Sequence, residues 1–223
     1  MYHSVVFGTK NTWEDWHLIP SSRPTISMAP VTSEKFIDIP GKDGQLDISD
    51  YALGHPTYGN RTGSIEFIVV NDWWDWIEAY HTIASYLHGK RMKLILEDDD
   101  PFFYFEGRFK VNQWNSDKDW SKITIDYTLD PFKKSSILTD RSYEVTDSMT
   151  VSLHCGDEYI SPNFKLTDGS LTLTYTDSSG TSVTKSLASG DNVIEDYYLS
   201  PGMNTVIFAG TGTVQPIYRE GYL

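Results

Sequence analysis

Hydrophobic residues alternate with polar ones along most of the first half of the chain, which is the pattern of strands with one buried face. The alternation is clear in Ser64–Val70, Met92–Leu96, Phe102–Trp114 and Trp120–Leu129. Turn residues separate the strands, above all Pro40-Gly41-Lys42-Asp43-Gly44, where a proline and two glycines suit a tight turn with positive φ. A second turn is expected at Gly59–Gly63. The pattern predicts several antiparallel strands.

One segment has a different period. Between Asn71 and Gly89, apolar residues recur every three or four positions, as on one buried face of a helix. This face consists of Trp73, Trp76, Ile77, Tyr80, Ile83, Ala84 and Leu87. Asn71 or Asp72 can cap the start, and His88-Gly89 suits the end. We expect one helix, about 71–89, packed across the strands.

The second half has no helical period. Short strand candidates follow one another between Gly-, Ser- and Asp-rich turns, at the spacing of a β-sandwich. They are Tyr143–Cys155, Asn163–Leu166, Ser170–Thr176, Thr181–Leu187, Asn192–Tyr198, Thr205–Ala209 and Thr213–Arg219. The fold class is therefore mainly β, with one helix in the first half.

Composition changes near residue 134. All seven Trp lie before it, and so do fourteen of the 18 Lys and Arg when Lys134 is included, whereas Ser and Thr dominate the remainder. Two hydrophobic cores with different side-chain compositions explain this change in composition. We place the boundary in Pro131–Ser136, which gives one domain at 1–134 and a second at 135–223.

The chain has 223 residues and a net charge of −13, so it has no basic stripe for binding a phosphate backbone. It has no run of 18 apolar residues, and Met1–Lys10 does not resemble a signal peptide. Cys155 is the single cysteine and cannot form an internal disulfide. We expect synthesis in a cytoplasm and no membrane insertion.

Motifs that carry chemistry are scarce. Asp98-Asp99-Asp100 lacks the alternating ligand spacing of a calcium loop and fits a solvated turn better. The six histidines show no zinc-ligand spacing, and the Walker and G-x-S-x-G patterns are absent. We predict no catalytic residue, no cofactor and no metal. Glycoside hydrolysis stays open, because two carboxylates can pair in space without a motif.

The tryptophans divide by position. Trp13, Trp73, Trp76 and Trp120 occupy core-like periodic positions, whereas Trp74 falls off the buried face of the helix. An aromatic residue outside the core is a candidate for contact with another subunit.

Several elements in succession resemble the distal tail protein (Dit) family of long-tailed, non-contractile bacteriophages that infect Gram-positive bacteria. The elements are Asn11–Trp16 with Leu18, Arg23-Pro24, Pro30, Ile39–Asp47, Tyr58–Gly63, the helix, Tyr127–Phe132, Gly210–Val214 and Tyr218–Leu223. They span nearly the whole chain, and their order carries more information than any one of them.

The resemblance implies an N-terminal ring-forming domain of β-sandwich or split-barrel type, akin to tail-tube subunits, and a galectin-like β-sandwich after it. It implies a six-fold ring at the virion tail tip, between the tube protein and the tail-associated hub protein, that anchors receptor-binding proteins. DNA would pass through without specific binding, and no enzymatic activity is implied. The second domain lacks the large insertion that carries a carbohydrate-binding module in some relatives.

Rings arise from head-to-tail contacts that close, and extended arms or edge strands can provide them. We expect Asn11–Pro30 and the Pro40–Leu46 turn to contribute. The interface candidates are Trp13, Trp16, Arg23, Pro40, Asp43, Arg61 and Trp74.

The alternative is a carbohydrate-binding β-sandwich protein for adhesion to the host surface. It requires exposed aromatic residues in the second domain, where Tyr159, Tyr175, Tyr197 and Tyr198 are available.

Overall fold

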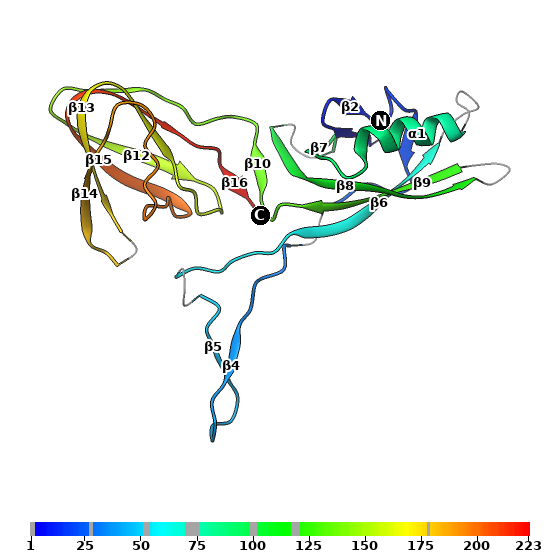
Figure 1. Ribbon diagram of the computed structural model, residues 1–223, viewed down its shortest axis with the longest axis horizontal. Helices are drawn as coiled ribbons and strands as arrows, with labels where there is room; N and C mark the ends of the chain where they lie inside the picture. Colours follow the sequence, from blue (N-terminus) through cyan, green and yellow to red (C-terminus); the bar gives the residue numbers. More distant parts are fainter. Residues whose placement is uncertain are drawn as a thin grey trace. The chain divides into compact units, whose positions relative to one another are not determined.

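The computed structural model describes residues 3–26, 29–50, 54–69, 76–98, 102–116, 121–177 and 179–223. These residues form one α-helix and sixteen β-strands (Figure 1), which confirms a mainly β fold with one helix. The chain divides into two compact units, Met1–Lys133 (unit 1) and Lys134–Leu223 (unit 2), and the division falls within Pro131–Ser136.

Unit 1 contains an antiparallel sheet with the strand order β2-β1-β7-β8-β9-β6-β3. Its strands are β1 (Val5–Phe7), β2 (Lys10–Asn11), β3 (Leu18–Pro20), β6 (Arg61–Val69), β7 (Arg91–Leu96), β8 (Phe103–Ser116) and β9 (Ser121–Leu129). On a flat sheet, β1 and β6 would lie about 19 Å apart, at about 4.8 Å per strand. The rings of Phe7 and Phe67 are nevertheless 6.2 Å apart. The sheet therefore curls around one core.

Helix α1 (Trp76–Leu87) lies against this sheet (Figure 1) and confirms the predicted helix over those residues. The predicted start at 71–75 lies outside the described residues. Ile83 and Leu87 are fully buried, but Ile77 is 47% exposed, so its assignment to the buried face was wrong. At 100° per residue, Ile77 lies about 120° around the helix from Ile83.

The helix ends where the sequence predicts. Gly89 has a φ of +73°, a conformation that favours glycine, and its N–H donates to the carbonyl of Phe109 at 2.8 Å.

Two glycines in unit 1 serve packing rather than turns. The sequence predicts a turn at Gly59–Gly63, but β6 already begins at Arg61. A Cβ on Gly63 would lie 2.4 Å from the hydroxyl oxygen of Tyr127, and one on Gly107 would lie 2.2 Å from the carbonyl oxygen of Thr128. Both glycines lie within continuous strands. Glycine suits each position because a close neighbour occupies the space that a side chain would need.

Unit 2 is organised around two long antiparallel strands, β13 (Asn163–Thr176) and β15 (Gly202–Ile217). The other strands are β11 (Tyr143–Val145) and β12 (Ser148–Cys155), which pair with β15, β14 (Ser182–Ser186), which pairs with β13, and β16 (Gly221–Tyr222), which pairs with β10 (Lys133–Ser135). The core of the unit contains Phe164, Leu173, Val206 and Phe208, all fully buried.

Both long strands are continuous where the sequence predicts two strands each. The pairing of β13 with β15 shifts between Leu166 and Asp168, and Gly169 has a φ of +78°. A Cβ on Gly169 would lie 2.0 Å from the carbonyl oxygen of Thr211. These residues thus mark a bulge within a strand pair and not a connecting turn.

The remaining strand predictions in unit 2 need two corrections. Tyr143–Cys155 is two strands, because β11 and β12 pair with successive parts of β15. Asn192–Tyr198 is not a strand. It contains a single bridge at Val193 and a turn in which the Tyr197 N–H donates to the Ile194 carbonyl at 3.1 Å.

Candidate assembly interface

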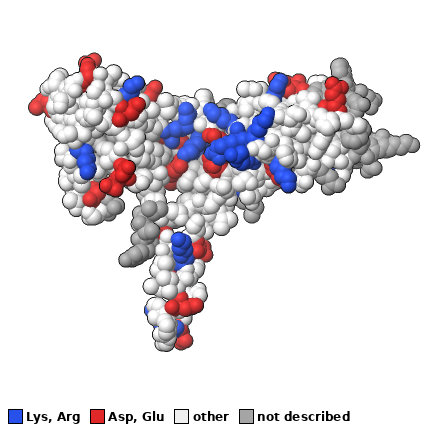
Figure 2. All heavy atoms as spheres, in the orientation of Figure 1, with Lys and Arg blue, Asp and Glu red and all other residues white. Residues whose placement is uncertain are grey.

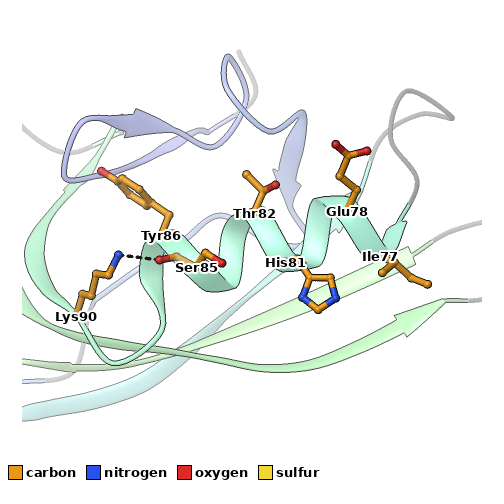
Figure 3. A pocket seen from close by; sticks show the side chains of 7 residues that line it. All are labelled: Ile77, Glu78, His81, Thr82, Ser85, Tyr86 and Lys90. Atoms are coloured by element: carbon orange, nitrogen blue, oxygen red, sulfur yellow. Dashed lines mark hydrogen bonds between the residues drawn. The ribbon is translucent and has the colours of Figure 1, made fainter.

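A surface hollow of about 830 Å³ runs along α1 (Figure 3). It is lined by Ile77, Glu78, His81, Thr82, Ser85, Tyr86 and Lys90. The side chains of Glu78 and Thr82 point to one side of the helix, whereas His81 points to another. The Lys90 ammonium donates to the carbonyl of Ser85 at 2.7 Å and closes the helix end.

Several polar side chains of the described residues form hydrogen-bonded groups. Asp98 accepts from Arg23 Nε at 3.0 Å and is also bonded to His3 Nδ1. The Tyr222 hydroxyl donates to Glu220, which raises the pKa of Tyr222 to about 12. Within the described residues, no group of three or more His, Cys, Asp and Glu is placed to hold a metal ion.

Basic side chains gather over the part of unit 1 that contains β7 and β8 (Figure 2). Arg91 and Arg108 lie directly opposite each other there. Ion pairs balance this repulsion, because Arg91 Nε donates to Glu106 at 3.1 Å and its guanidinium also binds Asp130. This surface is thus an ion-paired outer sheet face.

The described part of α1 is too short and too polar to cross a bilayer, and the structure describes no other helix.

Strands β4 (Phe36–Asp38) and β5 (Gln45–Asp47) form a separate two-stranded hairpin (Figure 1). Gly41 and Gly44 have φ angles of +80° and +83°, which confirms the predicted tight turn with positive φ.

The two faces of the hairpin differ in polarity. Ile37 lies directly opposite Leu46, and the Ile48 N–H donates to the Lys35 carbonyl at 2.9 Å. Because side chains alternate along a strand, Ile37, Ile39, Leu46 and Ile48 share one face. Ile37, Ile39 and Leu46 are 48%, 36% and 47% exposed. This set is called the apolar hairpin face below.

Polar contacts fix the opposite face. Gln45 Nε2 donates to Asp38 at 2.9 Å. Asp47 accepts from the hydroxyl and the N–H of Ser49, at 2.5 and 2.9 Å, and these bonds lower the pKa of Asp47. Phe36, which is 50% exposed and lies opposite Asp47, also belongs to this face. The hairpin is thus amphipathic, with one aromatic ring on its polar face.

An isolated hairpin is at best marginally stable in water. Fully burying a Leu or Ile side chain is worth about 1.5–3 kcal/mol, so covering the exposed halves of Ile37, Ile39 and Leu46 is worth about 3 kcal/mol. An exposed apolar surface bordered by polar residues is typical of protein–protein contact sites. The apolar hairpin face is therefore the strongest candidate interface in unit 1.

The predicted interface residues occupy different environments. Pro40 and Asp43 are exposed in the hairpin turn. Arg23 is exposed and paired with Asp98. Trp13 is partly buried, with its ring 5.5 Å from that of His17. Trp74 lies outside the described residues.

Two further candidates belong to the core of unit 1. Trp16 is 5% exposed and lies 6.4 Å from the Phe7 ring. Arg61 is 7% exposed, and its Nε donates to the Pro131 carbonyl at 2.7 Å. The burial lowers the pKa of Arg61. As interface residues, all seven candidates remain predictions.

Ile37 and Leu46 are not among the interface residues that the sequence predicts. The signal was present, because apolar residues at 37, 39, 46 and 48 fall on one face once the turn at Pro40–Gly44 joins two strands.

No protein-family model matches the chain, and no curated protein matches it either. Among solved structures, it is similar to the crystal structure of SPP1 Dit (gp 19.1), which is described as a paradigm of the hub adsorption apparatus in Gram-positive infecting phages. The TM-score is 0.70 at 15% sequence identity, and the match covers 99% of each chain. The chain has a Dit fold. Because the likeness covers almost the whole length, the Dit-like fold includes both units, and the resemblance found in the sequence is confirmed at the level of fold.

Proposed function

We propose that this Dit-like chain is a structural component of a phage tail tip. Copies would form a closed ring, six-fold as the family resemblance implies, between the tail tube protein and the tail-associated hub protein. The ring would anchor receptor-binding proteins. The apolar hairpin face carries this proposal, and the full-length likeness to SPP1 Dit supports it.

The hairpin suits a head-to-tail contact. A ring requires that each subunit presents one surface and receives another, and that the rotation between neighbours closes. An amphipathic hairpin that forms its own sheet can supply the presented surface, because its apolar residues gain about 3 kcal/mol only when another chain covers them.

The chain's charge agrees with a passive channel. A net charge of −13 gives no general attraction for DNA, so the polymer could pass without binding. We propose a non-enzymatic role in the virion, after synthesis in the bacterial cytoplasm.

The genes beside this one provide a direct test. Genes for a tape-measure protein and for other tail-tip proteins on either side would support the proposal. A neighbourhood of metabolic genes, with no tail genes, would contradict it.

A further inference from the structure

Two of the four tyrosines considered for glycan contact are accessible in unit 2. Tyr175 and Tyr197 are 3% and 4% exposed, and their rings lie 4.4 Å apart in the core. Tyr159 and Tyr198 are 36% and 53% exposed. Only the second pair can meet a ligand from solution.

The backbone places these two tyrosines on the same face. Ile160 and Leu199 form an antiparallel bridge with both N–H···O bonds, at 3.1 and 2.8 Å. Tyr159 therefore lies opposite Ser200, and Ser161 lies opposite Tyr198. Leu199 is fully buried. Because side chains alternate along a strand, the face opposite Leu199 carries Tyr159, Ser161, Tyr198 and Ser200. Diagonal neighbours in such a pair are about 7–8 Å apart at Cα, within reach of aromatic side chains.

We propose that Tyr159 and Tyr198 form a binding platform for a neutral saccharide. Each tyrosine offers a flat apolar ring to the C–H face of a sugar and a hydroxyl at its edge. The serine hydroxyls between them supply polar contacts. Ser200 donates to Asn204 Oδ1 at 3.0 Å and Ser161 donates to the Ile194 carbonyl at 3.4 Å. Each serine oxygen keeps lone pairs that can accept from a sugar hydroxyl.

The negative charge of unit 2 favours a neutral ligand over an anionic one. Residues 135–223 contain four Lys and Arg against eleven Asp and Glu, and acidic side chains are visible on unit 2 in Figure 2. Asp196 is exposed two residues before Tyr198. A negative surface repels a polyanion such as poly(glycerol phosphate) but does not oppose an uncharged sugar. This inference does not depend on ring formation.

The test uses the full chain with neutral oligosaccharides of glucose, galactose and N-acetylglucosamine, and with poly(glycerol phosphate) as the anionic probe. Saturation-transfer NMR identifies binders and calorimetry gives the Kd. We expect a neutral oligosaccharide to bind. Tyr198→Ala should weaken binding about tenfold, as truncation of a central aromatic contact does, and Tyr198→Phe should retain most of the affinity. Ile207→Ala is the matched control, because Ile207 is 39% exposed in β15 and pairs with Thr150 and Thr174, not with the segments that contain the two tyrosines.

Neutral binding that Tyr198→Ala or Tyr159→Ala weakens, and Ile207→Ala does not, supports the platform. Three results overturn it: no neutral saccharide binds, only poly(glycerol phosphate) binds, or both tyrosine variants bind as the wild type does. Equal melting temperatures of the variants and the wild type exclude misfolding as the cause of a loss.

Discussion

A charge placed on the apolar hairpin face should prevent assembly while leaving the subunit folded. Leu46 is 47% exposed in the single chain, so covering its remaining surface is worth about 1 kcal/mol. Leu46→Asp removes that gain and leaves an unpaired carboxylate in the contact, which adds about 3 kcal/mol or more. Each contact should therefore weaken by more than 100-fold, at about 1.4 kcal/mol per factor of ten. The free subunit should change by no more than about 0.5 kcal/mol, because the side chain is on its surface.

Sedimentation velocity at a concentration where the wild type assembles measures the effect, and thermal unfolding checks the subunit. Gln45→Glu is a stringent control, since it adds the same charge to the opposite hairpin face. It also places two carboxylates together, because Gln45 contacts Asp38. If assembly were lost only because the hairpin is less stable, Gln45→Glu would lose assembly as well. If Leu46→Asp assembles like the wild type, the apolar hairpin face is not the contact. If Gln45→Glu fails equally, the loss reflects a weakened hairpin and not the apolar face.

Three further predictions concern the two cores. Arg61→Ala should destabilise unit 1 by about 1–3 kcal/mol in tryptophan-monitored urea unfolding, because the Pro131 carbonyl loses a charged donor; an unchanged midpoint would contradict the core role. Phe208→Ala should destabilise unit 2 by about 3–5 kcal/mol in calorimetry, with no shift in tryptophan fluorescence, since every Trp precedes residue 134. Burial raises the pKa of the Cys155 thiol and of Tyr218 to about 12, from 9.0 and 10.0. Their neutral forms stabilise the fold fully below pH 9, so the melting temperature of unit 2 should fall between pH 9 and 12; a constant value across that range would refute the assignment.

Local signals in the sequence predicted the elements that local physics determines. The end of α1 follows from His88-Gly89, because a glycine with positive φ terminates a helix. The hairpin turn follows from the glycines at 41 and 44 for the same conformational reason. Strand alternation located β7, β8 and β9 to within one or two residues, since their buried faces repeat every second position.

The errors arise where distant parts of the chain decide the outcome. Gly169 lies between two predicted strands, yet β13 continues through it, and the neighbouring backbone leaves no room there for a side chain. The burial of Trp16 and Arg61 is also determined by the curled sheet, and their place in an interface remains a prediction. Exposure of an amphipathic hairpin likewise depends on what covers it, so alternation alone could not show that Ile37 and Leu46 face solvent.

We propose above all that copies of this chain assemble into closed rings through the hairpin. Light scattering across a wide range of concentrations, combined with electron micrographs of the same samples, tests it most directly. We expect a discrete mass at a fixed multiple of 25.4 kDa and ring-shaped particles with an open centre. A strict monomer at every concentration, with no rings in the micrographs, would contradict it.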